Sequence, residues 1–261
     1  MENGFALLRD VSLYYEKRGS GPAIVFIHGL GLDCTMWNEQ FQFSWGNFEL
    51  VRYDLRGFGK SSLPGEQSYS HHQDLHALLK YLHVPKAVLI GLSMGGRIAI
   101  DFALSFPEMT GSLILVDSAL HGYTFTTFSL ENIYATAKEK GITEANDEWL
   151  KHELFHAANK NPATQNALNR IVASYSGWHW TNKNPWKPLD PPSIQQLHKI
   201  KTPTLILVGE LDLPDFQKIA NILSNNITGS KKITIPGVGH MSNMEDPEAF
   251  NKIVADFLLE M

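Results

Sequence analysis

The chain has 261 residues, 43% of them hydrophobic, and a formal net charge of -5. This length suits one compact α/β domain with an insertion, and the absence of a basic field disfavours nucleic acid as a partner. Its single cysteine, Cys34, excludes intrachain disulfides and thiolate metal clusters.

The amino terminus, residues 1–9, has no basic stretch followed by a long apolar run, which disfavours secretion. The longest apolar runs are the length of strands, far short of the roughly 20 residues that a membrane helix requires. We expect a soluble, cytoplasmic protein that acts on a small molecule and has no membrane partner.

Short β-branched runs alternate with amphipathic stretches of helical length, a pattern typical of parallel strands joined by crossover helices. Residues 5–8 and 11–15 are expected to form an antiparallel hairpin at the sheet edge. The other candidate strands are 23–27, 49–53, 87–90, 113–116, 204–208 and 232–235. We predict an α/β fold with a mostly parallel sheet of about eight strands flanked by helices.

The alternation stops between residues 119 and 192. Helical patterns at 130–140 and 147–158 dominate there, and prolines and tryptophans crowd its end. We expect an inserted helical cap, 119–192, on a core formed by 1–118 and 193–261. Trp178, Trp180 and Trp186 fall within nine positions of each other. They either line an apolar pocket or pack the cap on the core.

Ser93 lies between the strand run ending at Leu92 and a helical stretch, 94–106. Gly91 and Gly95 flank it and give a sharp strand-to-helix turn room to close. The free amides and positive end of the following helix favour negative charge at the serine. The position of Ser93 between a strand and a helix predicts that it is a nucleophile. The alternative is a glycine-rich turn without a catalytic role.

A serine hydroxyl needs a base to take its proton, and histidine titrates in the useful range. Of the eleven histidines, only His240 follows the final strand through a glycine-rich loop, 236–239, and precedes the last helix, 246–259. We assign His240 as the base. His71 and His72 are expected to be solvated or capping residues.

An acid must hold the other nitrogen of the histidine. Asp212 follows the strand at 204–208 and completes the chain order serine, acid, histidine, so it is our first candidate. Asp215 on the same loop is a close rival, and Asp117, after the strand at 113–116, is a weaker one.

The oxyanion of a tetrahedral intermediate must meet fixed donors. The amide of Met94 follows the nucleophile directly. The second donor is expected from the loop after the strand at 23–27, where Gly29 and Gly31 allow close approach, which makes the Leu30 amide the candidate. No cofactor is required by this chemistry.

These motifs resemble the α/β-hydrolase superfamily, specifically its small esterase and enol-lactonase branch. The motifs are His28-Gly29-Leu30-Gly31, Asp54-Leu55-Arg56-Gly57-Phe58-Gly59-Lys60-Ser61, Gly91 to Gly96, Gly209-Glu210-Leu211-Asp212 and Gly239-His240. The resemblance implies ester or lactone cleavage through an acyl-enzyme, and it implies that His28, Asp54 and Arg56 brace loops. Haloalkane dehalogenases and epoxide hydrolases place an aspartate where this chain has Ser93, so both are excluded.

Arg97 stands one helical turn after the nucleophile and is a candidate ligand for a substrate carboxylate; the alternative is a surface or packing role. The segment from Gly91 to Arg97 is similar to the menaquinone-pathway synthase that eliminates pyruvate with the same triad. The segment around His240 looks more like ordinary hydrolases, and Arg170 is the only arginine of the expected cap. This lyase is kept as an alternative.

The candidate substrate-binding residues are Arg97, Tyr123, Phe125, Trp178 and Trp180. A second alternative is a receptor or signalling protein that retains the triad and uses the pocket to bind a ligand. His152-Glu153-Leu154-Phe155-His156 is a literal H-E-x-x-H zinc motif. No third ligand stands out, so no metal site is predicted.

Overall fold

The computed structural model describes residues 1–260, in which eight strands form a single sheet in the order β1-β2-β4-β3-β5-β6-β7-β8. The strands are β1 (Glu2–Leu7), β2 (Ser12–Arg18), β3 (Ala23–Ile27), β4 (Glu49–Tyr53), β5 (Ala87–Leu92), β6 (Thr110–Val116), β7 (Thr204–Gly209) and β8 (Lys231–Ile235). β2 pairs antiparallel with β1 and with β4, and every other pairing is parallel. The predicted α/β fold is confirmed.

The amino-terminal hairpin is longer than the sequence pattern predicts. β2 continues to Arg18 because residues 15–18 pair with residues 50–53 of β4, an inner strand. The hydrophobic pattern of the hairpin alone carries no information on this partner. The prediction that the second strand ends at Tyr15 was therefore too short.

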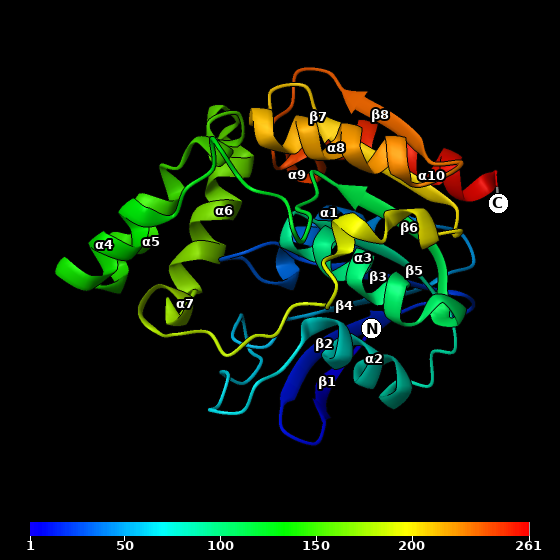
Figure 1. Ribbon diagram of the computed structural model, residues 1–261, viewed down its shortest axis with the longest axis horizontal. Helices are drawn as coiled ribbons and strands as arrows, with labels where there is room; N and C mark the ends of the chain where they lie inside the picture. The colour runs from blue at the N-terminus through cyan, green and yellow to red at the C-terminus, as the bar shows by residue number, and fades with distance from the viewer. Residues whose placement is uncertain (261) are drawn as a thin grey trace.

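Helices cover both faces of the sheet, which explains why β3, β5 and β7 are buried along their whole length. The core helices are α1 (Asn38–Gln42), α2 (His71–Tyr81), α3 (Met94–Ser105), α8 (Pro214–Asn226), α9 (Ser242–Glu245) and α10 (Pro247–Leu259). α2 packs on α3, and α1 packs on α10 (Figure 1). No helix in residues 1–260 combines the length and the apolar character needed to cross a membrane.

The segment at 119–192, called the cap segment below, contains α4 (Glu131–Glu139), α5 (Ile142–Leu150), α6 (Pro162–Ser174) and α7 (Trp178–Thr181). These green helices project from one end of the sheet in Figure 1. Short 3-10 turns are η1 (Cys34–Trp37), η2 (Pro107–Met109), η3 (Glu153–Phe155), η4 (Ala158–Lys160), η5 (Ser193–Gln195) and η6 (Leu197–Lys199).

Two details of the cap segment correct the sequence prediction. The helix expected at 147–158 begins at Ile142 and ends at Leu150, and 3-10 turns follow it. α6 was not predicted, although it has a start signal: the Asn161 side chain accepts hydrogen bonds from the Ala163 and Thr164 amides, and Pro162 opens the helix.

Candidate active site

Ser93 lies at the junction of β5 and α3 in a strained backbone conformation, with φ 54° and ψ -114°. A non-glycine residue with positive φ costs about 1–3 kcal/mol and persists only when its surroundings hold it. The Ser93 amide donates to the Val116 carbonyl at 2.9 Å, and the Ser93 carbonyl accepts from the amides of Arg97 and Ala119. These contacts with β6 and α3 fix the turn that presents the side chain.

The glycines around Ser93 are required by close backbone approach. A Cβ on Gly91 would lie 2.3 Å from the Gly95 carbonyl oxygen, and a Cβ on Gly95 would lie 2.1 Å from the Ile27 carbonyl oxygen. No side chain fits at such distances. The turn at Ser93 therefore packs directly on the end of β3, where the loop carrying Leu30 begins.

His240 and Asp212 meet at the carboxyl end of the sheet. The Nδ1 atom of His240 lies 2.9 Å from Oδ2 of Asp212, and both residues are buried. Because a carboxylate only accepts hydrogen bonds, this contact places the ring proton on Nδ1 and leaves Nε2 as an acceptor. Burial lowers the pKa of His240 to about 4. His240 is therefore neutral at pH 7.

Glu245, which the sequence reasoning missed, holds the loop that carries His240. Its two carboxylate oxygens accept hydrogen bonds from the amides of Gly239 at 2.7 Å and Met241 at 3.0 Å. These amides belong to the residues on either side of His240. The side chain thus fixes the backbone position of the histidine, which no local motif indicates.

Asp215, the rival candidate for the acid, forms its hydrogen bonds with the cap segment. Its carboxylate accepts hydrogen bonds from the amides and hydroxyls of Thr126 and Thr127, from the Phe128 amide and from the Tyr123 hydroxyl. Burial opposes the charge, but these donors hold the pKa of Asp215 well below its usual range. Asp215 therefore ties α8 to the cap segment and makes no hydrogen bond with His240.

Three polar side chains cluster at this point: oxygens of Asp117 and Asp212 and a ring nitrogen of His240 all lie within 4.8 Å of one another. Such a group has the donor set of a cation site. However, all four carboxylate oxygens already accept hydrogen bonds, from Gly209, Ser242, Leu213 and His240. A bound cation would have to displace these donors, so the residues fit a hydrogen-bond network better than a metal site.

The two amides predicted to hold an oxyanion lie on adjacent loops. Met94 opens α3, so its N–H has no partner within the helix. Leu30 follows β3 in the loop on which the Ser93 turn packs, and both residues line one cavity with Ser93 and His240. In residues 1–260 neither amide donates a hydrogen bond outside regular secondary structure. Both donors are available to a ligand.

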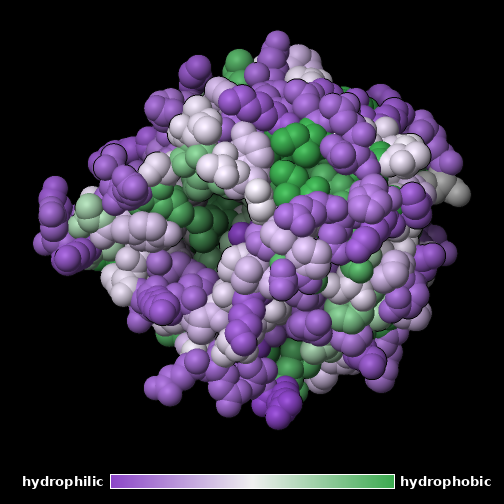
Figure 2. All heavy atoms as spheres, viewed as in Figure 1, coloured by the Kyte–Doolittle hydropathy of each residue, from purple (hydrophilic) through white to green (hydrophobic). Residues whose placement is uncertain are grey.

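This cavity measures about 270 Å³ and has two chemically different regions. Apolar side chains from the cap segment and α8 form one region, among them Phe125, Phe128, Trp149, Phe155 and Phe216. Polar side chains, His71, Arg97 and His179, form the other. Figure 2 shows apolar residues lining a hollow between the cap segment and the core.

Arg97 lines the cavity without a salt-bridge partner, and the nearest charge that favours its cation is the buried Asp101 carboxyl one turn along α3. Its Nε atom is buried with no hydrogen-bond partner, and in residues 1–260 no carboxylate lies within ion-pair distance of its guanidinium. The Trp186 ring stacks on the guanidinium with 4.2 Å between the arginine carbon and the ring centre. Burial lowers the pKa of Arg97 from a high ordinary value, so the group stays cationic at neutral pH.

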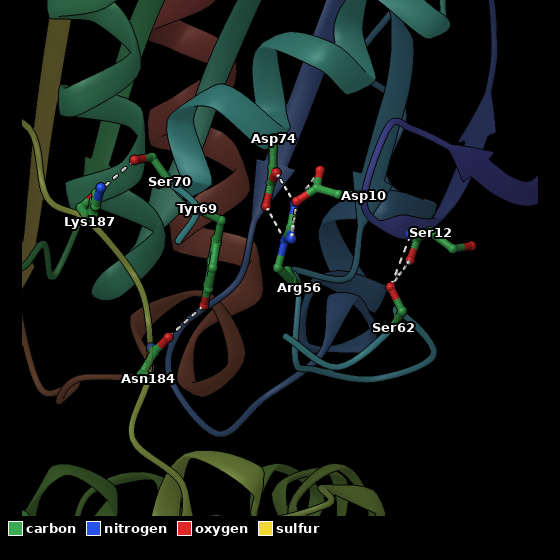
Figure 3. Close-up of polar contacts among 9 residues, drawn as sticks. All are labelled: Asp10, Ser12, Arg56, Ser62, Tyr69, Ser70, Asp74, Asn184 and Lys187. Carbon is green, nitrogen blue, oxygen red and sulfur yellow. Dashed lines mark hydrogen bonds and ion pairs between the residues drawn. The ribbon is translucent and has the colours of Figure 1, made fainter. Parts of the chain in front are cut away.

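Hydrogen bonds to the start of α2 position Trp186 over Arg97. The Tyr69 hydroxyl donates to Asn184, and the Ser70 hydroxyl donates to the Lys187 carbonyl (Figure 3). The Lys187 amide also donates to the Tyr69 carbonyl at 2.7 Å. The last part of the cap segment is therefore fixed to the core beside the cavity.

Three of the residues expected in the pocket do not line this cavity. The Tyr123 hydroxyl donates to Asp215 instead, and the buried Trp180 donates its ring N–H to Asn146 inside the cap segment. Trp178 lines a separate surface groove near Pro64. Phe125 and Arg97 do line the cavity, together with Trp149 and Trp186. The cluster of tryptophans indicated which segment lines the cavity, but it did not indicate which of the rings face it.

The residues expected to brace loops make the contacts that such a role requires. His28 accepts from the Leu55 amide at 2.9 Å, and Asp54 accepts from the amides of Cys34 and Lys60. Arg56 forms ion pairs with Asp10 and Asp74 (Figure 3). All of these contacts except Asp54 with Lys60 link segments that are distant in the sequence.

The histidines at the start of α2 correct another expectation. His71 and His72 are buried rather than solvated, with exposed fractions of 2% and 5%. Burial lowers the pKa of both rings, so both are neutral. His71 packs edge-on against Tyr69 and has no partner for its Nδ1 atom in residues 1–260. The first turn of α2 is buried by tertiary contacts that the local sequence does not indicate.

The H-E-x-x-H motif does not form a zinc-binding helix. Residues 153–155 form a 3-10 turn, and His156 is exposed. Both ring nitrogens of His152 contact backbone groups, the Leu154 amide and the Ser129 carbonyl. This side chain therefore has no free nitrogen for a metal.

Comparison with known proteins identifies the family of the chain. The model of the alpha/beta hydrolase family matches residues 24–253. Similar proteins include 3-oxoadipate enol-lactonase 2 of Acinetobacter baylyi, 27% identical over 94% of this chain and 92% of the relative. Another is the pimeloyl-[acyl-carrier protein] methyl ester esterase of Wigglesworthia glossinidia brevipalpis, 30% identical over 92% and 95%.

The solved structures give the same fold. The enol-lactonase of Burkholderia xenovorans superposes with a TM-score of 0.82 at 24% identity, covering 98% of this chain and 100% of that one. The fold is thus shared over nearly the full chain.

Proposed function

The chain belongs to the alpha/beta hydrolase family, and we propose that within it this protein hydrolyses a carboxylic ester or lactone through an acyl-enzyme on Ser93. The observation that carries the proposal is the arrangement at the cavity. Ser93 and His240 line the same space, and Asp212 fixes the ring of His240 with Nε2 free to accept a proton.

The proposed reaction uses only groups of this chain. The Ser93 hydroxyl attacks the substrate carbonyl carbon while His240 Nε2 takes its proton, and Asp212 stabilises the imidazolium. The amides of Leu30 and Met94 hold the oxyanion. His240 then gives the proton to the leaving alkoxide, and water attacks the acyl-enzyme with His240 again as base, which frees Ser93 and the acid.

We propose that residues 119–192 act as a cap that closes the cavity, and that its two regions select the substrate. The apolar region, with Phe125, suits the carbon skeleton. Arg97 suits a carboxylate, because a buried cation that lines the cavity without a salt bridge favours an anionic ligand. The preferred substrate is therefore an ester or lactone with a second, free carboxylate.

The test is a panel of esters, lactones and β-diketones, each run with wild type and with Ser93→Ala as the blank. We expect turnover of esters or lactones that depends on Ser93. The lyase alternative is less supported, since Arg97 is the only Lys or Arg side chain lining the cavity in the described structure, and a polyanionic substrate would require several. Negligible turnover throughout, with a large thermal shift on ligand binding, would favour the receptor alternative.

Arg97 gives a test of substrate choice. In Arg97→Met, kcat/KM for a half-ester of a dicarboxylic acid is expected to fall about 10²-fold, the usual cost of removing one partner of a desolvated charge pair. The corresponding neutral diester should lose far less. Arg170→Met, which changes an exposed arginine of the cap segment, is the matched control. Equal losses for both substrates in Arg97→Met would contradict the carboxylate assignment.

The burial of His240 predicts the pH dependence. His240 must be neutral to accept the proton of Ser93, and its pKa is lowered to about 4. We expect His240, followed by the NMR signals of its ring, to stay neutral down to about pH 4, so that a fall in kcat/KM above that pH belongs to Asp212, whose pKa burial raises. A titration of His240 centred near 6.5, the ordinary value for histidine, would contradict this.

The same burial predicts a loss of stability in acid. Between about pH 6.5 and pH 4 the unfolded chain binds a proton at His240 that the folded chain does not. The free energy of unfolding should therefore decrease as the pH falls through this window. His240→Gln removes this contribution, and denaturant unfolding of both proteins at several pH values measures it.

A further inference from the structure

Asp117 is a second buried carboxyl group beside the Asp212–His240 pair, at the end of β6. Its backbone has a φ of 43°, in the left-handed region. Its exposed fraction is 1%, and one of its oxygens lies within 4.8 Å of an oxygen of Asp212 and of a ring nitrogen of His240. A carboxyl group so placed needs a role, because an isolated buried charge is strongly unfavourable.

The side chain of Asp117 bridges the loops that carry the acid and the histidine. One oxygen accepts from the Gly209 amide at 2.7 Å, and Gly209 is the last residue of β7 before the Asp212 loop. The other oxygen lies 2.6 Å from the Ser242 hydroxyl, two residues beyond His240. Asp117 therefore holds the Asp212 loop and the His240 loop at a fixed position relative to each other.

The charges around Asp117 determine its protonation. It faces Asp212, His240 and Ser242, and Glu245 lies nearby but is occupied by the amides of Gly239 and Met241. Burial and then the charge of Asp212 raise the pKa of Asp117 well above its ordinary value. Two carboxyls this close in a buried site ionise one at a time.

Hydrogen bonding indicates which group holds the proton. Each oxygen of Asp212 faces an N–H group, from Leu213 and from His240, so a proton on Asp212 would displace one of these donors. Asp117 faces a hydroxyl on one side, and the Ser242 oxygen can accept as well as donate. Protonated Asp117 can also donate to Asp212. The proton therefore belongs on Asp117 and the charge on Asp212.

We propose that Asp117 is a positioning residue that shares one proton with Asp212 and becomes the anion facing His240 when Asp212 is neutralised. This inference rests on the proposed function, because it assigns a role beside the same histidine. In the wild type the proton of Ser93 passes through His240 to the leaving alkoxide, a proton from water later returns to Ser93 by the same histidine, and the proton on Asp117 stays in place. In Asp212→Asn the neighbouring charge is gone and burial alone raises the pKa of Asp117, so Asp117 releases its proton to water at a lower pH than in the wild type, and its carboxylate then stabilises the imidazolium.

The test is a double-mutant cycle of Asp117→Asn and Asp212→Asn, with kcat/KM measured across pH. We expect Asp117→Asn to cost at least about tenfold more in the Asp212→Asn background than in the wild type, a coupling of about 1.4 kcal/mol. The residual activity of Asp212→Asn should rise with pH as Asp117 ionises. If Asp117→Asn lowers kcat/KM by the same factor in both backgrounds, or if the pH profiles keep their shape, Asp117 has only a structural role and the proposal is overturned.

A spectroscopic measurement covers the case in which Asp117→Asn does not fold. In wild type labelled with 13C at the aspartate carboxyls, one buried carboxyl should still be protonated at pH 7, and it should become ionised in Asp212→Asn. Ionisation of every aspartate in the wild type at pH 7 would overturn the shared proton. A different result would contradict the proposed function: ester or lactone turnover that persists in Ser93→Ala.

Discussion

Replacing Ser93 with alanine is expected to lower kcat/KM for the best ester or lactone by about 10⁴-fold or more, the range found when a serine nucleophile is removed. Alanine cannot form the acyl bond, and the amides of Leu30 and Met94 alone leave only weak catalysis. Initial rates, corrected for spontaneous hydrolysis, measure the loss. Loss of labelling by an active-serine reagent should accompany it.

The fold of Ser93→Ala should stay intact, which makes this variant a clean test. The hydroxyl of Ser93 makes no hydrogen bond in residues 1–260, and the backbone contacts of Ser93 with Val116, Arg97 and Ala119 do not involve the side chain. We expect a melting temperature close to that of the wild type. A rate equal to that of the wild type would remove Ser93 from the mechanism whatever the stability.

The sequence predicts the fold well where a local pattern and a tertiary contact point to the same structure. β5, the turn at Ser93 and α3 are an example, because the apolar run, the glycines and the amphipathic stretch occur in one short segment. The extension of β2 to Arg18 was missed because it depends on pairing with β4, about 35 residues further along the chain. Propensity describes the strand and says nothing of its partner.

The candidate site shows the same limit at the level of side chains. Chain order was enough to bring Asp212 and His240 forward as partners, and the structure places them 2.9 Å apart. Chain order could not show that Glu245 holds the His240 loop or that His71 is buried beside Arg97, because these contacts join different elements. Trp180 was misplaced for a related reason. An aromatic side chain is expected to be buried, but this holds both for a pocket wall and for the interior of the cap segment, where Trp180 lies.

Asp212→Asn and Asp215→Asn form a matched pair, since the two aspartates lie three residues apart, Asp212 just before α8 and Asp215 in its first turn, and both are buried. Asp212→Asn should lower kcat/KM about 10³-fold, because an amide neither fixes the Nδ1 proton of His240 nor stabilises its charge. The reserve anion proposed at Asp117 would keep this loss below the roughly 10⁴-fold of a triad with one acid.

Asp215→Asn should lower the stability of the fold and leave the activity nearly unchanged. An amide offers one acceptor oxygen, so several donors around Thr126 and Thr127 lose their partner, which costs about 1–3 kcal/mol of folding free energy. Its kcat/KM should change only a few-fold, because the carboxylate of Asp215 makes no hydrogen bond with His240. Denaturant unfolding and ester hydrolysis, measured on both variants, separate the two roles. If Asp215→Asn loses more activity than Asp212→Asn at equal stability, the acid role passes to Asp215.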